Sequence, residues 1–279
     1  MTQSEKANAL LALHKNDRLL ILPNVWNPIG ARMLEAKGFP AVATASAAIA
    51  ESLGYSDGEN IKLDTMLGAV ERIVRSVNVP VSADFEAGYS NSIEGLQENV
   101  SRLLDTGAVG INIEDSFDNE KSLRSIPEQT ERIRAIRETA ERRGIHLVIN
   151  ARADSFLAEG FPSEEERIED AITRSLAYIE AGADCVYPIG RSDRETIKVL
   201  RERIPAPINI FAAPQAASLK ELRKLGVNRV SFGPFIFRSL LAKMSAMYDE
   251  IKNLGGYEII INGIMTGNEV QKFLAEGKE

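Results

Sequence analysis

The chain has 279 residues, of which 44% are hydrophobic and 26% charged, as is typical of a folded globular protein. Its formal net charge of −7 argues against nucleic-acid binding, which requires a clustered basic surface. No apolar run approaches the ~20 residues of a membrane span, and residues 1–6 lack the layout of a signal peptide, so we expect a cytoplasmic protein without membrane partners.

A short amphipathic helix is predicted over residues 4–15, and about eight strand–helix units follow it. The strands are predicted at residues 19–22, 41–44, 79–84, 110–114, 147–152, 185–187, 208–211 and 229–231. The later helices are predicted at residues 28–37, 65–76, 93–106, 127–143, 163–181, 194–203, 218–225 and 234–253. Five helices are followed by a glycine that can end a helix in the left-handed conformation: Gly38, Gly107, Gly144, Gly182 and Gly226.

Short apolar strands that alternate with longer helices indicate a parallel sheet covered on both sides. Eight such units close into a (β/α)8 TIM barrel. We therefore predict an α/β fold with one barrel domain, in which the barrel spans about residues 17–253 and a helical extension spans residues 254–279. An open doubly wound sheet is the alternative, and it is disfavoured because no GxGxxG turn follows the first strand.

Acidic residues gather where the predicted strands end. Asp84 and Glu86 stand two residues apart, so an extended backbone points both carboxylates to the same side. Glu114 ends the next strand, and Asp57 lies in the connection after the strand at 41–44. In a barrel these positions share the rim on which function is built. The alternative interpretation is that the acids only cap the helices that follow the strands.

Several carboxylates around one rim repel one another unless a cation lies among them. An all-oxygen set favours Mg²⁺, with Mn²⁺ as the second possibility, and neither His14 nor His146 is well placed as a zinc ligand. Arg152 ends the strand at 147–152 and suits a carboxylate or a developing enolate oxygen. It could equally pair with Asp84 or Glu114 and hold the rim together.

In this order, the motifs resemble the isocitrate lyase/phosphoenolpyruvate mutase superfamily, in particular its phosphonomutase-like members. The resemblance covers about residues 17–244. It rests on LPNVWN at 22–27, the small-residue loop at 44–48, SLGYSDG at 52–58, ADFEAGY at 83–89, IED at 113–115 and NARAD at 150–154.

The resemblance implies a barrel with Mg²⁺ at the carboxyl rim and an α-keto acid or its enolate on the metal. It implies that Asp84 is the nearest metal carboxylate and that Asp57, Glu86 and Glu114 hold metal-bound waters. Arg152 would hold an enolate or carboxylate oxygen.

For substrate binding, the resemblance implies that Ala45, Ser46 and Ala47 offer backbone N–H groups to a carboxylate or phosphonate, and it places Trp26 near the substrate. It also implies a mobile lid at residues 116–126. Homodimers or homotetramers that exchange their last barrel helix are common in the superfamily and are expected here.

Three departures from the superfamily pattern narrow the expected activity. The segment 116–124 contains no cysteine, and the single Cys185 lies in an apolar strand, so isocitrate and methylisocitrate cleavage are disfavoured. Glu86 stands where a second Asp is more common. The strand that ends at Tyr187 lacks the histidine typical of the mutases.

We therefore expect a Mg²⁺-dependent lyase that acts on a small α-keto acid through an enolate, with Arg152, Glu114 and Asp57 as catalytic residues. Oxaloacetate-type decarboxylation is the first specific expectation. One alternative is phosphonate chemistry, by a phosphoenolpyruvate or carboxyphosphonoenolpyruvate phosphonomutase or a phosphonopyruvate hydrolase. The other is a non-catalytic α-keto acid binding protein.

Overall fold

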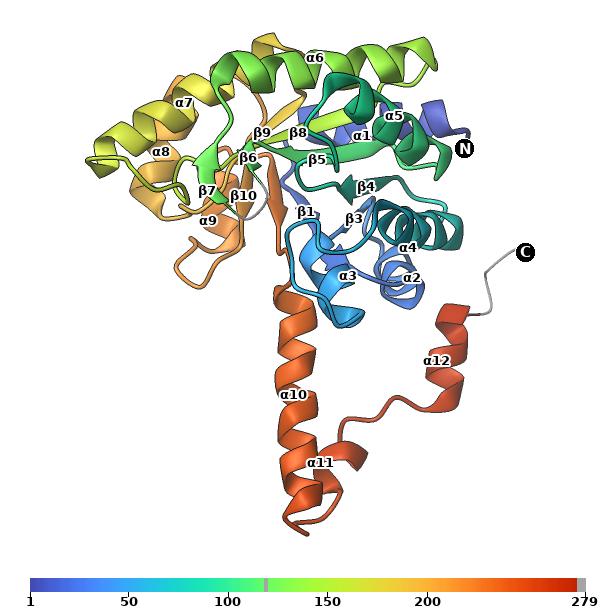
Figure 1. The fold of residues 1–279 in the computed structure, drawn as a ribbon. Coiled ribbons are helices and arrows are strands. Elements are labelled where there is room, and N and C mark those ends of the chain that lie inside the picture. The colour runs from blue at the N-terminus through green and yellow to red at the C-terminus, as the bar shows by residue number, and fades with distance from the viewer. Residues whose placement is uncertain (118–119, 275–279) are drawn as a thin grey trace.

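In the computed structural model, which describes residues 1–117 and 120–274, parallel strands close into a barrel (Figure 1). The strands are β1 (Leu20–Leu22), β2 (Asn24–Val25), β3 (Val42–Thr44), β4 (Val81–Asp84), β5 (Gly110–Glu114), β8 (Val148–Ala153), β9 (Cys185–Pro188), β10 (Asn209–Phe211) and β11 (Arg229–Ser231). One sheet has the order β2-β3-β4-β5-β8-β9 and the other the order β1-β11-β10. Pro23 alone separates β1 from β2, and a bridge between Val186 and Ile208 joins β9 to the segment before β10, so the ring is complete. The predicted (β/α)8 barrel is confirmed.

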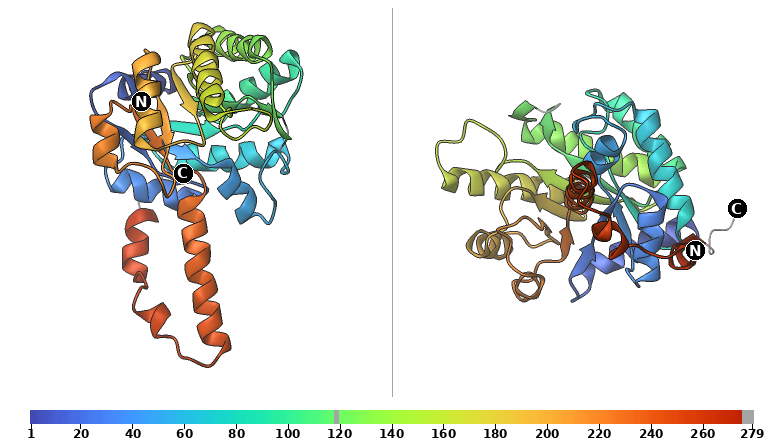
Figure 2. Two further views of the ribbon diagram at one scale, coloured as in Figure 1. Left: turned by 90° about the vertical axis from the view of Figure 1, so that its left-hand side faces the viewer. Right: turned by 90° about the horizontal axis from the view of Figure 1, so that it is seen from below.

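Helices surround the strands in the expected alternation (Figures 1 and 2). They are α2 (Pro28–Ala36), α4 (Leu63–Ser76), α5 (Ile93–Asp105), α6 (Ile126–Arg142), α7 (Glu164–Glu180), α8 (Arg194–Arg203) and α9 (Leu219–Lys224). Serine caps start several of them; for example, the side chains of Ser92 and Ser163 accept hydrogen bonds from backbone N–H groups in the first turn. All five predicted helix-ending glycines have φ between 68° and 110°. No helix of the described residues is long and apolar enough to cross a membrane.

The N-terminal helix α1 (Gln3–Lys15) closes the amino end of the barrel. Leu10 on α1 is fully buried, and a Cβ atom on Gly110 would come within 2.8 Å of its side chain. His14, also on α1, is completely buried and reaches Arg229 on β11. Because this end is plugged, the open end of the barrel is the carboxyl rim.

Three features depart from the sequence expectation. The small-residue loop after β3 is a short helix, α3 (Ser46–Ser52), because a run of alanines favours helix once the first turn has partners. The expected lid begins with an antiparallel hairpin of β6 (Ser116–Phe117) and β7 (Glu120–Leu123), while residues 118–119 lie outside the described part.

The third departure is α10 (Phe235–Lys252), which extends away from the barrel (Figures 1 and 2). After α11 (Glu258–Ile261), the chain returns and α12 (Gly267–Leu274) lies beside α2. There the guanidinium of Arg32 donates a hydrogen bond of 2.8 Å to the carbonyl oxygen of Leu274.

Candidate active site

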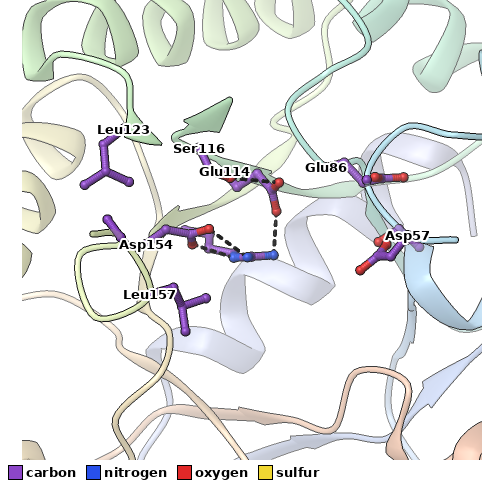
Figure 3. Close-up of a pocket in the computed structure, with 11 residues that line it drawn as sticks. Asp57, Glu86, Glu114, Ser116, Leu123, Asp154 and Leu157 are labelled. Carbon is purple, nitrogen blue, oxygen red and sulfur yellow. Dashed lines mark hydrogen bonds and ion pairs between the residues drawn. The ribbon is translucent and has the colours of Figure 1, made fainter. Parts of the chain in front are cut away.

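Two adjoining cavities open among the carboxyl ends of the strands. The first is lined by Asp57, Glu86, Glu114, Arg152 and Asp154, with Leu123 and Leu157 as apolar neighbours. The second shares Ser46, Asp57 and Arg152 with the first and is lined further by Asp84, Asn112, Asn209 and Arg229. In Figure 3, Leu123 and Leu157 lie on one side of the first cavity, and Glu86 and Asp57 lie on the other. All the charged residues predicted for the site therefore meet at one rim.

Arg152 is locked between two carboxylates. Its Nη1 atom lies 2.5 Å from Oε2 of Glu114, and its Nε and Nη2 atoms donate to the two oxygens of Asp154 at 2.6 and 2.7 Å. Burial by itself would lower the pKa of Arg152, but Asp154 and Glu114 raise it well above its usual value. The expected ion pair with Glu114 is thus present, and the guanidinium is permanently charged and fixed in direction.

Asp84 is held by three hydrogen bonds to its carboxylate. Its Oδ2 atom accepts from the backbone N–H and the hydroxyl of Ser46 at 2.9 and 2.7 Å. Its Oδ1 atom accepts from Nδ2 of Asn112 at 2.8 Å, and Asn150 donates in turn to Asn112 at 2.7 Å. These bonds use both oxygens but leave Oδ1 one lone pair for a further ligand.

Glu86 is buried and turned toward its own loop. The hydroxyl of Tyr89 donates to its Oε1 atom at 2.8 Å, and the backbone N–H of Glu59 donates to its Oε2 atom. Burial raises the pKa of Glu86 to about 7. The backbone of Glu86 has φ of 50°, a strained value for a residue with a side chain, which is often found at functional sites.

The environments of Asp57 and Glu114 also disfavour the charged form of each carboxyl group. Burial, and then the charge of Asp84, raise the pKa of Asp57. Burial raises the pKa of Glu114, and Arg152 offsets this only in part. Burying charged carboxylates near one another costs free energy, and this cost falls when one of them is protonated or when a cation lies among them.

The donor set fits a hard divalent cation, because every candidate ligand is a carboxylate oxygen. Within residues 1–117 and 120–274, no three His, Cys, Asp or Glu side chains converge closely enough to hold an ion directly. This arrangement suits Mg²⁺, which retains several waters and needs few direct protein ligands. Asp84 has the available lone pair and lines the second cavity, Asp57 lines both cavities, and Glu86 and Glu114 line the first.

The predicted backbone donors are only partly available. The N–H of Ala45 donates to the carbonyl oxygen of Val25 at 3.1 Å, and that of Ser46 donates to Asp84. Both expectations of a free N–H are therefore corrected, since α3 and β4 use these groups for their own placement. Ala47 lines the second cavity from the first turn of α3.

Trp26, predicted near the substrate, packs edge-to-face on Phe237 of α10 with ring centroids 5.0 Å apart. It is not among the residues that line either cavity. Cys185 is fully buried, and burial raises the pKa of its thiol to about 12, as expected for an inert cysteine.

Sequence reasoning missed Asn112 and Arg229. Both lie inside the barrel, two residues before a rim residue on the same strand: Asn112 before Glu114, and Arg229 before Ser231. Their position at alternate residues of a strand was the available signal, because such residues face the same side.

Comparison with known proteins agrees with this architecture. The sequence profile of the family described as phosphoenolpyruvate phosphomutase matches residues 10–252. A 2-methylisocitrate lyase from Aeropyrum pernix is 29% identical over 92% of this chain and 83% of its own. A crystal structure from Burkholderia cenocepacia J2315, provisionally described as a lyase or mutase, has a TM-score of 0.88 and 32% identity over 98% of this chain and 96% of its own. The fold is also that of a phosphonopyruvate hydrolase solved with oxalate and Mg²⁺, with a TM-score of 0.84 and 24% identity over 99% of this chain and 96% of its own.

Proposed function

Because the chain belongs to the phosphoenolpyruvate phosphomutase family, within the isocitrate lyase/phosphoenolpyruvate mutase superfamily, we propose that it is a Mg²⁺-dependent lyase. Its substrate is a small α-keto acid, and the reaction passes through an enolate. The first specific candidate is decarboxylation of an oxaloacetate-type acid, which breaks the bond between C3 and the C4 carboxylate and leaves the electron pair on the pyruvate enolate.

The observation that carries the proposal is the fixed guanidinium of Arg152 opposite an acid-rich wall in one cavity. Enolate formation places negative charge on the former keto oxygen, and a preoriented cation stabilises that charge without reorganising. Glu114 and Asp154 provide this orientation by holding the guanidinium on two sides.

A metal ion completes the proposed site. When bound, Mg²⁺ supplies positive charge to the keto and carboxylate oxygens of the substrate. Asp84 would hold it directly, while Asp57, Glu86 and Glu114 would hold its waters. Ser46 and Asn112 keep the Asp84 carboxylate in place, and Ala47 offers the substrate carboxylate its backbone N–H.

The proposed decarboxylation is consistent with the side chains at hand. The departing CO₂ needs no proton from the protein, and the chain has only one cysteine, which is buried in β9. Leu123 and Leu157 make one wall of the first cavity apolar, and an apolar wall favours loss of a charged carboxylate as neutral CO₂.

Phosphonate chemistry is the second candidate, because the matching family is described as phosphoenolpyruvate phosphomutase. The same Asp84 and Arg152 would hold phosphonopyruvate, whose carboxylate and keto oxygens match those of oxaloacetate. The third candidate is a protein that binds an α-keto acid without turnover, and the experiment must distinguish it from both reactions.

We also propose that the protein is a homodimer or larger homo-oligomer joined through α10. The helix projects from the barrel, and Leu240, Leu241 and Met244 on it are each more than 40% exposed. Isolated apolar helix faces of this kind mark interaction surfaces, and a second copy that exchanges α10 would cover them.

A substrate panel followed by NMR tests the function. Oxaloacetate, phosphonopyruvate, phosphoenolpyruvate and 2-methylisocitrate are each incubated with Mg²⁺ and again with EDTA. We expect pyruvate from oxaloacetate, at a rate that Asp84→Ala reduces to the level of free Mg²⁺. Asp64→Ala, which removes an exposed surface carboxylate, is the matched control. Turnover of phosphonopyruvate alone would assign the phosphonate reaction, and full activity of Asp84→Ala would refute the site.

A further inference from the structure

Two loops at the carboxyl rim carry acids of the candidate site, and one further side chain joins these loops. The first loop, residues 53–62, connects α3 to α4 and carries Asp57. The second loop, residues 85–92, connects β4 to α5 and carries Glu86. Glu59 lies in the first loop, two residues after Asp57. The sequence pattern did not single out Glu59, so its role follows from its contacts alone.

Glu59 contacts the second loop in both directions. Its backbone N–H donates a hydrogen bond to Oε2 of Glu86. Its own Oε1 atom accepts a hydrogen bond of 2.6 Å from the backbone N–H of Tyr89. The hydroxyl of Tyr89 in turn donates to Oε1 of Glu86 at 2.8 Å. These three bonds form a closed ring of contacts among Glu59, Glu86 and Tyr89, which we call the clasp.

The backbone of the clasp is strained on both sides. Among the described residues, four that are not glycine have positive φ, and three of them are Glu59, Glu86 and Tyr89, with φ of 58°, 50° and 57°. A left-handed backbone is unfavourable for a residue with a side chain, and it persists where the surrounding contacts impose it. The bonds of the clasp supply such contacts, so each loop helps to hold the conformation of the other.

The second loop is also anchored from behind by two helices. The side-chain amide of Asn99 on α5 donates to the carbonyl oxygens of Gly88 and Tyr89 at 3.0 and 3.1 Å. Arg132 on α6 is 1% exposed, and its Nη2 atom donates to the carbonyl oxygen of Ala87. The second loop is therefore the fixed half of the clasp.

The first loop is more exposed than the second. Residues 52–57 are all exposed, and the loop becomes buried only at Ile61, just before α4. The carboxyl group of Asp57 interacts with the backbone N–H of Gly58, which belongs to the same loop. Asp57 and Glu86 nevertheless lie together on one side of the first cavity (Figure 3). The place of Asp57 at the rim therefore depends on where Glu59 holds its loop.

We propose that Glu59 is a positioning residue that sets Asp57 and Glu86 at the rim as one unit. Glu59 is not among the residues that line the two cavities, so it acts through its neighbours and not on the substrate. The clasp rests on the contacts described above. Its effect on Mg²⁺ rests on the proposed function, in which Asp57 and Glu86 hold waters of the metal.

Amide hydrogen exchange, measured by mass spectrometry, tests the clasp without metal or substrate. In Glu59→Ala the N–H of Tyr89 loses its acceptor, and we expect the amides of residues 59 and 89 to exchange at least about ten-fold faster. Glu59→Gln removes the charge but keeps an acceptor oxygen, so it restores slow exchange.

The matched control for this measurement is Glu71→Ala, which removes an exposed carboxylate of α4 that pairs with Arg75. It should leave the exchange of residues 59 and 89 unchanged. Unchanged exchange in Glu59→Ala overturns the proposal, and so does equal acceleration in Glu59→Ala and Glu59→Gln.

Titration with Mg²⁺ tests the consequence for the site. We expect Glu59→Ala to raise the Kd for Mg²⁺ about ten-fold, because the residues that hold the metal waters lose their placement. Glu59→Gln should stay close to the wild-type Kd, which separates loss of the bond from loss of the charge. In a protein that already carries Asp57→Asn and Glu86→Gln, adding Glu59→Ala should change the Kd no further, because Glu59 acts only through those two residues.

Two results of the titration count against the positioning role. A wild-type Kd in Glu59→Ala would overturn it even if exchange is faster, and so would a full effect of Glu59→Ala in the Asp57→Asn/Glu86→Gln protein. Asp84→Ala distinguishes this failure from that of the proposed function. If Asp84→Ala leaves the Kd unchanged, the proposed metal site itself is wrong, whereas the exchange result for the clasp stands independently.

Discussion

Asp84 illustrates how the site is prepared at the level of single residues. Ser46 and Asn112 hold both of its oxygens, and Asn150 fixes the amide of Asn112. Such supporting hydrogen bonds orient a metal ligand and are needed for full affinity. Under the proposed function Asn112 is therefore a positioning residue, although it has no charge and was not singled out by its sequence.

Replacing Asn112 tests this role. In Asn112→Ala the Oδ1 atom of Asp84 loses its donor, and we expect the Kd for Mg²⁺ to rise about ten-fold. Calorimetric titration with Mg²⁺ measures the effect. Asn16→Ala, which alters an exposed amide after α1, leaves the Kd unchanged. Wild-type affinity in Asn112→Ala would show that Ser46 alone positions the carboxylate.

His14 predicts a pH-dependent contribution to stability. Its pKa is lowered from 6.5 to about 4 in the folded protein by burial and by Arg229, so between these values the unfolded chain binds the additional proton. The free energy of unfolding therefore falls as pH is lowered through this window, by up to about 3 kcal/mol.

The measurement is urea unfolding of wild type and His14→Gln from pH 4 to pH 8. The difference between the two isolates His14 from the carboxylates that titrate nearby. We expect the free energy of unfolding of His14→Gln to rise relative to that of the wild type as the pH falls below 6.5. A pH-independent difference for His14→Gln contradicts the assignment.

At the level of elements, a buried polar cluster ties the hairpin of β6 and β7 to the barrel. Asp115 follows β5 and is fully buried. Its Oδ2 atom accepts from Tyr178 and Arg174 of α7 at 2.5 and 3.2 Å, and its Oδ1 atom accepts from the backbone N–H of Asp154 at 2.9 Å. The carbonyl oxygen of Asp115 also accepts from the N–H of Arg124, which follows β7. One carboxylate thus joins β5, β8, α7 and the hairpin.

Removal of this carboxylate should destabilise the protein strongly. Asp115→Ala leaves the hydroxyl proton of Tyr178 without its acceptor and Arg174 with Asp170 as its remaining counter-ion, and we expect a loss of about 3–5 kcal/mol in the free energy of unfolding. Chemical denaturation measures it. Glu164→Ala breaks an exposed ion pair with Arg191 and should cost less than about 1 kcal/mol. Similar losses in the two variants would show that Asp115 is dispensable to the cluster.

At the level of the whole molecule, α10 is the element that the barrel does not cover. Only Phe237 near its start is buried, where it packs on Trp26. Leu240, Met244, Tyr248 and Ile251 follow at helical spacing and are exposed. In the proposed homo-oligomer this stripe is covered by a second copy of the chain, which presents the same stripe.

The oligomeric state tests this assignment. We expect the wild-type protein to sediment as a dimer or larger assembly and Leu240→Asp/Met244→Asp to sediment at a lower mass, because the charges fall in the apolar stripe. Ala242→Asp adds a charge to the opposite face of the same helix and should leave the mass unchanged. A monomeric wild-type protein would contradict the assignment.

The sequence by itself determined the barrel and the location of its acids. Strand and helix periodicity are local signals, and parallel strands bring all their carboxyl ends to one rim, so Asp57, Asp84, Glu86, Glu114 and Arg152 could be placed together from their spacing alone. The chain's alternation was sufficient for the barrel strands and for the helices α4 to α9 between them, but not for α3 or the hairpin of β6 and β7. The ligand and catalytic roles of these residues stay predictions until the substrate panel is run.

Only the tertiary structure decided which polar groups contact one another. His14 and Arg229 are 215 residues apart in sequence, and Asn150 reaches Asn112 across 38 residues, distances over which no periodicity carries information. The register between strands and the plug formed by α1 set these contacts. The direction of α10 could not be predicted from the sequence either. The sequence of an amphipathic helix shows that one face is apolar, but it does not show which surface covers that face.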